Sequence, residues 1–218
     1  MATILCIETA TTSCSVAISK NGKLIDLLED TSKQYSHAEK LHVFINDILK
    51  KNNLEPKNLD AVAVSKGPGS YTGLRIGVST AKGLCFALDL PLISIPTMQS
   101  LARKVNEPGI IIPMLDARRM EVYSAVFQSD FTQIRDTKAE ILDEQSFLNY
   151  LENSKVNFIG DGVSKFKEIC HHQNASFIEA ELPSAAQMAE LAEEKFKKSD
   201  LEDVAYFEPY YLKDFIAG

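Results

Sequence analysis

The sequence is short of positive charge and lacks the segments that place a protein in a membrane. Its 218 residues carry 23 Lys and Arg against 30 Asp and Glu, a formal net charge of -7. This balance opposes independent binding to a phosphate backbone, so we expect any RNA contact to be made through a partner. The opening MATILCIETA runs directly into strand-like sequence without a basic segment or a long apolar run. We therefore expect a cytoplasmic protein with no membrane contact.

Recognisable catalytic and metal-binding motifs are also missing. The four cysteines stand singly in apolar stretches: Cys6, Cys14, Cys85 and Cys170. They form no CxxC pair, which favours buried reduced thiols over a zinc or redox site. There is no GxSxG elbow and no identifiable Ser/His/Asp or Cys/His set. His37 and His42 lie about 140° apart on a helix and cannot share one metal ion. We predict no catalytic residue, no metal and no intrinsic cofactor, and leave weak nucleotide binding open.

The pattern of apolar residues and turn signals predicts an α/β protein. Asn21-Gly22 is the dipeptide preferred in a two-residue hairpin turn, and Ser36 with Glu39 forms a capping-box pattern before a helix. The expected order is βββαβαβ and a short helix: strands at 3–9, 13–19 and 23–30, a helix at 36–52, a strand at 60–66, a helix at 72–88, a strand at 92–95 and a helix at 97–105.

The second half repeats this order without visible sequence repetition. The expected elements are strands at 110–116, 120–127 and 134–142, a helix at 144–153, a strand at 156–160, a helix at 163–172, a strand at 175–179 and a helix at 184–198. Two mixed sheets of βββαβαβα type, the second reduced, are the order of the actin-like (ribonuclease H-like) architecture. We expect domains at 1–100 and 101–218, with the C-terminal tail free to return to the first.

Two loops of the first domain carry groups that could bind an anion. GPGSYTG (67–73) joins a buried strand to a helix, whose amino-terminal N–H groups attract anions, although it matches neither a Walker loop nor GxGxxG. A tight, rigid turn is the alternative interpretation. At the first strand-to-strand turn, Glu8 and Ala10 stand where actin-like proteins usually have Asp and Gly, and both crowd a phosphate. A hydroxyl-rich hairpin is the alternative there.

Asp116 ends the first strand of the second domain and would mirror that position. Arg118 and Arg119 follow it, and an ordinary surface salt-bridge cluster explains them equally well. The resulting candidate for a vestigial nucleotide or anion site comprises Glu8, Thr9, Thr11, Thr12, Gly67, Gly69, Ser70 and Asp116.

The helix at 72–88 contains three glycines, each of which costs about 1 kcal/mol relative to alanine in a helix interior. Gly73 and Gly77 fall near one face and would leave a shallow strip for another backbone. The alternative is that the glycines let the helix sit close to its own sheet. The candidate partner-docking residues are Leu41, Phe44, Ile45 and Ile48 on the first helix and Gly73, Arg75, Gly77, Thr80 and Leu84 on the second.

Several segments together resemble the TsaB (YeaZ) family. They are ILCIETATTSCSVAI, KGPGSYTGLRIGVSTAKGLCFAL, LISIPTMQSLA and MLDARRMEVYSAVF, with PSAAQMAELA and PYYLKDF near the end. The match spans nearly the whole chain. The combination of GPGSYTGLRIG with DARRMEVY is far more specific than any single glycine motif.

The resemblance implies an actin-like protein that acts in threonylcarbamoylation of the adenosine 3′ of the anticodon in ANN-decoding tRNAs. In this family a TsaD subunit with a metal-binding HxxxH pair performs the transfer, and TsaE supplies ATPase activity. The chain would be a non-catalytic partner that docks TsaD through residues 36–52 and 72–88. Two alternatives stay open: a stand-alone actin-like enzyme, either a small-molecule kinase or a glycoprotease-like peptidase, and a self-associating homodimer.

Overall fold

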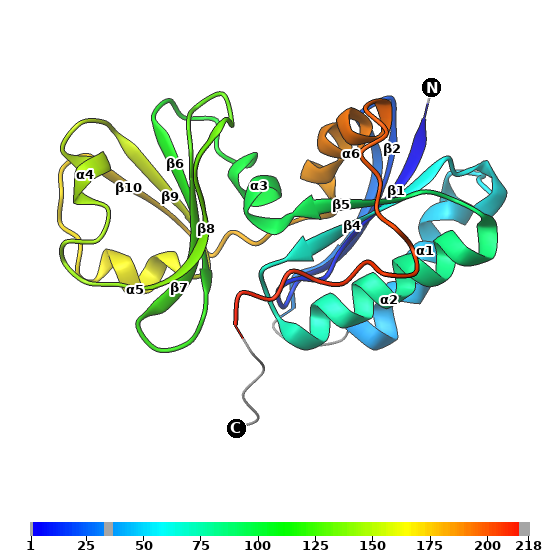
Figure 1. Ribbon diagram of the computed structural model, residues 1–218, viewed down its shortest axis with the longest axis horizontal. Helices are drawn as coiled ribbons and strands as arrows, with labels where there is room; N and C mark the ends of the chain where they lie inside the picture. Colours follow the sequence, from blue (N-terminus) through cyan, green and yellow to red (C-terminus); the bar gives the residue numbers. More distant parts are fainter. Residues whose placement is uncertain (1, 33–36, 214–218) are drawn as a thin grey trace. The chain divides into compact units, whose positions relative to one another are not determined.

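The computed structural model describes residues 2–32 and 37–213, so Ser36 of the expected capping box lies outside the described residues. The chain forms two compact units (Figure 1). Unit 1 consists of Met1–Ser100 and Pro183–Tyr211, and unit 2 of Leu101–Leu182 and Leu212–Gly218. Each unit is built on a mixed sheet of five strands, as the order of elements in the sequence predicts.

The sheet of unit 1 has the strand order β3-β2-β1-β4-β5. β1 is antiparallel to β2 and parallel to β4, so the chain reverses at a hairpin and then crosses over. Asn21 (φ 54°) and Gly22 (φ 77°) occupy the two left-handed positions of the β2–β3 turn, as expected for an Asn-Gly pair. The strands are β1 Thr3–Glu8, β2 Cys14–Lys20, β3 Lys23–Asp30, β4 Ala61–Gly67 and β5 Leu92–Pro96.

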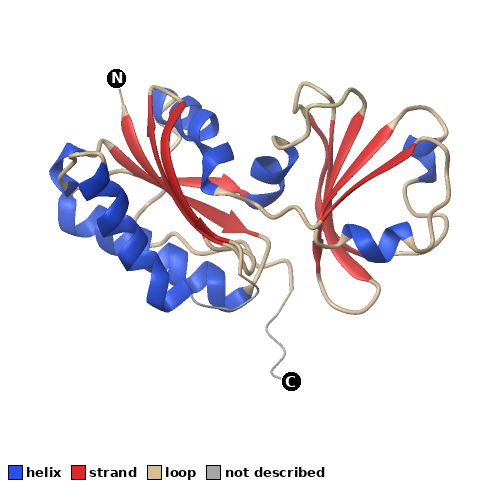
Figure 2. Cartoon of the chain, turned by 180° about the vertical axis from the view of Figure 1, so that it is seen from behind, coloured by secondary structure: helices blue, strands red, loops and turns tan. Residues whose placement is uncertain are grey.

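Helices cover both faces of this sheet (Figure 2). Side chains alternate along a strand, so Leu5 and Ile7 face α1 and α2, whereas Ile4 and Cys6 face α6. Within the described residues, no helix is both long and apolar enough to cross a membrane. The helices are α1 His37–Lys51, η1 Pro56–Asn58, α2 Tyr71–Leu88, α3 Thr97–Ala102, η2 Ala185–Gln187 and α6 Met188–Lys197.

The range 101–218 expected for the second domain is too long, because residues 183–211 belong to unit 1. Met188 and Leu191 of α6 are buried against the second face of the unit 1 sheet, which would otherwise expose its apolar side chains. Residues 201–211, named here the C-terminal strap, then run across β5 and along α2 (Figure 1). Its bonds to the body of unit 1 include Glu202 N–H to the Leu92 carbonyl (2.8 Å), Lys82 Nζ to the Phe207 carbonyl (2.9 Å) and Tyr210 N–H to the Lys66 carbonyl (2.7 Å).

Unit 2 repeats the sheet with the order β10-β9-β6-β7-β8 but has shorter helices. The helix expected at 144–153 is reduced because the Asp143 side chain accepts hydrogen bonds in a turn and Phe147 has a left-handed φ of 65°. The helix expected at 163–172 ends early, at Lys167. The elements are β6 Ile110–Asp116, β7 Glu121–Phe127, β8 Gln133–Ile141, α4 Leu148–Leu151, β9 Val156–Gly160, α5 Val163–Lys167 and β10 Ala175–Glu179.

Aromatic packing holds the core of unit 2 together. The ring of Phe158 lies 5.6 Å from that of Phe147 and 4.9 Å from that of Phe166, both edge-on. Phe177 stacks on the other side of Phe158 at 5.6 Å. Phe158 and Phe166 are both fully buried, and each contacts the other three rings, so the two together form the centre of the cluster.

We predict that Phe158→Ala lowers the free energy of unfolding of unit 2 by about 3–5 kcal/mol, because it opens a cavity among three rings. Denaturant unfolding followed by circular dichroism measures the change. Ile141→Ala is the control, because Ile141 is 75% exposed and its replacement should shift stability by less than about 0.5 kcal/mol. Equal effects of the two substitutions would contradict the central role of Phe158.

Candidate functional site

The β1–β2 loop and the glycine loop meet at one corner of unit 1. β1 and β4 are parallel neighbours, so the loops that follow them start at the same edge of the sheet. The Ser70 N–H donates to the Ala10 carbonyl at 2.6 Å. A Cβ on Gly69 would lie 2.2 Å from the same carbonyl oxygen, so only glycine allows this approach. We call residues 8–12 and 67–70 the closed corner.

Glu8 is the buried acid of the closed corner. Its side chain has no solvent exposure, and Oε1 accepts hydrogen bonds from the Ala10 N–H and the Ser65 hydroxyl, each at 2.7 Å. Oε2 has no hydrogen-bond partner among the described residues. Burial raises the pKa of Glu8 to about 7, and the bonds from Ala10 and Ser65 offset only part of this effect. The carboxyl group therefore titrates near neutral pH.

The threonines of the β1–β2 loop are mostly used within unit 1. The Thr9 hydroxyl donates to the Gly73 carbonyl at 2.8 Å, and Thr9 is fully buried. The Thr11 carbonyl contacts His37 Nε2 at 2.7 Å. Thr12 is partly buried. These contacts correspond to the alternative interpretation of this loop, a hydroxyl-rich hairpin.

The backbone amides of the glycine loop are likewise used internally. The Gly67 N–H donates to Thr97 Oγ1 at 3.1 Å, and Ser70 Oγ caps α2 by accepting from the Gly73 N–H at 3.3 Å. The Ser70 N–H, expected to face an anion, is bonded to Ala10 instead. The neighbouring loop thus occupies the space next to the Ser70 N–H, and an anion site at this loop stays a prediction. The closed corner contains Glu8, Thr9, Thr11, Thr12, Gly67, Gly69 and Ser70, whereas Asp116 belongs to unit 2.

The first two glycines of α2 face the protein interior. A Cβ on Gly73 would lie 2.1 Å from the Thr9 carbonyl oxygen, and one on Gly77 would lie 2.2 Å from Thr9 Oγ1. Gly83 is exposed, and a Cβ there would meet no atom within 4 Å. The expectation of an exposed docking strip at Gly73 and Gly77 is wrong. These glycines let α2 sit close to its own sheet.

The predicted docking residues of α1 are also turned inward. Leu41 and Ile48 are fully buried and Ile45 nearly so, in the core between α1, α2 and the sheet. Phe44 and Leu84 are partly buried against the same core. The regular apolar spacing that singled these residues out marks the face that a helix buries against its own domain. The prediction that a partner contacts Leu41, Ile45 and Ile48 is therefore wrong, whereas for the partly buried Phe44 and Leu84 it stays a prediction.

Arg75 and Thr80 lie farther out on α2. Arg75 is exposed, stacks over the Tyr71 ring at 4.3 Å and hydrogen-bonds with Tyr211 of the C-terminal strap, which raises the pKa of the guanidinium. The rings of Tyr71 and Tyr211 lie 4.7 Å apart. Thr80 is partly buried. Arg75 thus has a structural partner within unit 1 and still reaches solvent.

Sequence reasoning missed two apolar side chains on the outside of these helices. Val43 of α1 is 52% exposed and Phe86 of α2 is 86% exposed. Phe86 and Gly83 line a surface pocket with Lys82 and strap residues 203–205. We call the exposed residues of α1 and α2 the outer helix face. The signal that could have found Val43 and Phe86 is their position off the buried stripe of each helix.

Asp116 forms a salt bridge with Lys165, whereas the alternative interpretation expected a cluster with Arg118 and Arg119, which form no ion pair with a described residue. Its Oδ1 accepts from Lys165 Nζ at 2.9 Å and from the Arg118 N–H at 2.6 Å. The Asp116 N–H donates to Asp161 Oδ1 at 2.9 Å, and burial raises the pKa of Asp161. Arg118 (φ 72°) and Arg119 (φ 51°) are consecutive left-handed residues, each at a cost of about 1–2 kcal/mol.

The described residues contain no group of three or more His, Cys, Asp or Glu side chains that could hold a metal ion. All four cysteines are free and buried, and burial raises the pKa of Cys6 to about 12. His37 is buried against Thr11, whereas His42 is exposed. The two histidines thus lie in different environments, as their spacing predicts.

We predict that Gly73→Ala and Gly83→Ala change stability in opposite directions. The added methyl at position 73 collides with the Thr9 carbonyl, and overpacking of this kind costs about 1–3 kcal/mol or more. At position 83 the methyl enters open space, and helix propensity should stabilise the protein by about 0.5–1 kcal/mol. Thermal unfolding of both variants measures the difference. A Gly73→Ala protein as stable as Gly83→Ala would contradict the contact with Thr9.

We predict that Glu8 makes stability fall as pH rises. Its pKa is about 7 in the folded protein against an ordinary value of 4.5, so the folded state binds more protons between these values. The free energy of unfolding should drop by about 1.4 kcal/mol per pH unit in that window and level off above it. Glu8→Gln removes this titration. The free energy of unfolding of the variant should therefore rise relative to that of the parent from pH 5 to pH 8.

Unfolding curves at several pH values test this expectation. Glu29→Gln is the matched control, because Glu29 is exposed and interacts electrostatically with Glu8 without sharing its burial. A stability difference between Glu8→Gln and the parent that does not change with pH would rule out titration of Glu8 in this range.

Known proteins resemble the chain along nearly its whole length. Residues 29–217 match the family described as TsaD: tRNA N6-adenosine threonylcarbamoyltransferase. The tRNA threonylcarbamoyladenosine biosynthesis protein TsaB of Haemophilus influenzae is 30% identical over 97% of this chain and 94% of its own length. The corresponding Escherichia coli protein is 30% identical over 98% and 96%.

A solved structure gives the same answer for the fold. A Pseudomonas aeruginosa protein described as similar to the peptidase YeaZ superposes with a TM-score of 0.87 at 23% identity, covering 98% of this chain and all of that one. This likeness and the two mixed five-stranded sheets confirm the expected actin-like α/β fold. With curated relatives at 30% identity over almost the entire sequence, the chain belongs to the TsaB (YeaZ) family.

Proposed function

We propose that this chain is the non-catalytic partner subunit of a bacterial tRNA threonylcarbamoyl-transferase complex. It activates a TsaD-like subunit for threonylcarbamoylation of the adenosine 3′ of the anticodon in ANN-decoding tRNAs, in the cytoplasm. The names of its curated relatives place them in threonylcarbamoyladenosine biosynthesis, and the matching family description names the transferase. This membership supports the pathway, and the geometry of the closed corner supports the non-catalytic role.

The closed corner is the observation that carries the proposal. A phosphate approaching Glu8 would need donors from the two loops, yet the Ser70 N–H is already bonded to Ala10 and the Gly67 N–H to Thr97. Opening the corner would break these bonds. It would also separate two loops that lie so close together that a Cβ on Gly69 would come within 2.2 Å of the Ala10 carbonyl oxygen. The proposal therefore includes no intrinsic cofactor, and weak nucleotide binding stays a prediction.

The outer helix face is the surface proposed to dock the TsaD-like subunit. Phe86 is 86% exposed, and burying an aromatic side chain at an interface contributes about 1.5–3 kcal/mol. Aromatic side chains of this kind are frequent binding hot spots. Val43 adds a second exposed apolar group on α1. A TsaE-like ATPase completes the proposed assembly, and tRNA is bound in the complex rather than by this acidic chain alone.

The two alternative interpretations receive less support. A stand-alone kinase or peptidase requires an accessible catalytic set, and the closed corner instead commits its polar groups to internal bonds. A homodimer would use the same outer helix face as an isologous interface. It would then compete with the TsaD-like subunit, which a size measurement of the chain with and without that subunit can determine.

Reconstitution tests the proposed role. Modification of tRNA by TsaD, TsaE, threonylcarbamoyl-adenylate and ATP should collapse when this chain is omitted and return when it is added. When the Phe86→Asp variant is added back at limiting concentration, the rate of tRNA modification should be at least tenfold lower than with the parent chain. The reason is that docking would bury the new carboxylate in the interface. Ile141→Asp is the matched control, since Ile141 is 75% exposed on unit 2 and its replacement should leave activity unchanged.

Undiminished modification without the chain would reject the role as partner. ATP turnover or peptide cleavage by the purified chain alone would favour the stand-alone enzyme. Equal activity of Phe86→Asp and the parent would move the docking surface elsewhere while leaving the pathway intact.

A further inference from the structure

The β6–β7 turn places two arginines where the backbone disfavours them. Arg118 and Arg119 are consecutive residues with positive φ, in the region that favours glycine and asparagine. The β2–β3 hairpin of the same protein fills its two left-handed positions with Asn21 and Gly22. The chain thus uses the preferred residues at one such turn and arginines at the other. Strained backbone of this kind points to a role for the side chains.

The side chain of Lys165 holds the backbone of the turn in place. Lys165, whose side chain is only 13% exposed, donates from Nζ to the Arg119 carbonyl at 2.6 Å, to the Glu121 carbonyl at 3.1 Å and to Asp116 Oδ1 at 2.9 Å. Asp116 Oδ1 also accepts the Arg118 N–H. The backbone of the turn is therefore fixed by side chains that leave the arginine guanidinium groups unused.

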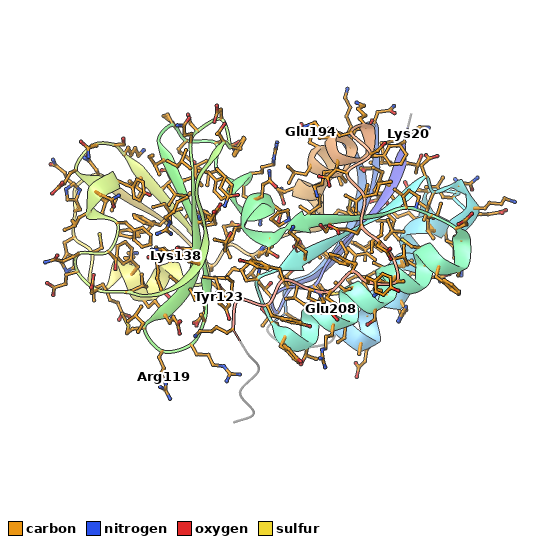
Figure 3. All side chains as sticks on the ribbon, in the orientation of Figure 1. Lys20, Arg119, Tyr123, Lys138, Glu194 and Glu208 are labelled. Atoms are coloured by element: carbon orange, nitrogen blue, oxygen red, sulfur yellow. The ribbon has the colours of Figure 1, made fainter. Side chains whose placement is uncertain are left out.

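The two acidic residues that flank the turn in sequence, Asp116 and Glu121, are already paired. Asp116 forms an ion pair with Lys165, and Glu121 forms one with Lys213. Neither Arg118 nor Arg119 forms an ion pair with any described residue. Both are exposed, and Figure 3 shows the Arg119 side chain extending away from the ribbon at the end of the hairpin. Among the described residues, two adjacent positive charges thus have no ion-pair partner, on a chain whose net charge is -7.

We propose that Arg118 and Arg119 contact the phosphate backbone of RNA, specifically the tRNA handled by the complex. This inference rests on the proposed function. It also changes one expectation from composition: the acidic chain has a local cationic contact at the β6–β7 turn, although its overall charge repels nucleic acid. Each guanidinium presents a planar fork of donors that matches a phosphate group in a bidentate arrangement.

An extended polyanion fits this turn better than a small phosphate compound. Both arginines are exposed, and Figure 3 shows Arg119 at the end of the hairpin, so they could contact successive phosphates of a backbone without enclosing a ligand. Phosphate contacts position a protein on nucleic acid and carry no sequence information. The contact is accordingly expected to orient tRNA rather than select its sequence. An acidic protein surface is the competing partner that the experiment must exclude.

The test uses a variant that suits the backbone while removing the charges. Arg118→Asn with Arg119→Gly places favoured residues at both left-handed positions, so its Tm should equal or exceed that of the parent. Lys20→Ala with Lys23→Ala removes the same charge from exposed positions of unit 1 and is the matched control. The affinity of the reconstituted complex for tRNA is measured at several salt concentrations, and pull-down of the TsaD-like subunit is measured in parallel.

We expect the arginine variant to bind tRNA about tenfold more weakly at 0.15 M salt. The slope of log K against log salt should become shallower by about 0.7–0.9 for each lost phosphate contact. Binding of the TsaD-like subunit should not change, and the lysine control should keep both the affinity and the slope. Arg118→Lys with Arg119→Lys should retain most of the salt slope while losing part of the affinity.

Unchanged tRNA affinity and slope in the arginine variant would overturn the proposal. Weakened pull-down of the TsaD-like subunit or of TsaE would overturn it in favour of an acidic protein partner. Binding of a short single-stranded RNA to the purified full chain at about 20 mM salt gives a second readout that needs no complex. Loss of this binding in the arginine variant alone supports the contact even if the omission experiment rejects the proposed function.

Discussion

The close approach of the amino-terminal half of α2 to the β1–β2 loop is the constraint on which the rest of unit 1 depends. Gly69 lies against the Ala10 carbonyl, and Gly73 lies against Thr9, in both cases closer than any Cβ would allow. This contact fixes the depth and rotation of α2 on the sheet. It therefore decides which residues of α2 are buried and which, including Phe86, point toward solvent.

The same contact brings the two polar loops of the closed corner together, so their polar groups bond to each other. Glu8 remains as a buried carboxyl group held by Ser65 and the Ala10 N–H, with one oxygen unpartnered. Such a group contributes little to stability once ionised, because burial disfavours its charge. Exposed apolar side chains of unit 1 lie instead on the outer surfaces of its helices, as at Val43 and Phe86, and on the C-terminal strap, as at Tyr206.

The sequence predicts the elements of this fold far better than their exposed surfaces. Strand and helix positions follow from alternation, helical spacing and turn residues, and the structure contains each predicted element, although the helices expected at 144–153 and 163–172 are much shorter than predicted. The spacing that located α1 also selected Leu41 and Ile48, but helical periodicity identifies a buried face without saying what buries it. The glycines of α2 are similarly ambiguous until the position of Thr9 is known. The left-handed backbone at Arg118 has no residue signature, because arginine is uncommon there.

The C-terminal strap and α6 impose an order on biosynthesis. The chain passes between the two units three times, after Ser100, after Leu182 and after Tyr211. When the first hundred residues leave the ribosome, the face of their sheet that α6 covers still exposes Ile4, Cys6 and their neighbours. Unit 2 is synthesised before that cover arrives. That face of unit 1 therefore stays uncovered until residues 183–211 have been translated, and exposed apolar surface of this kind is prone to aggregation.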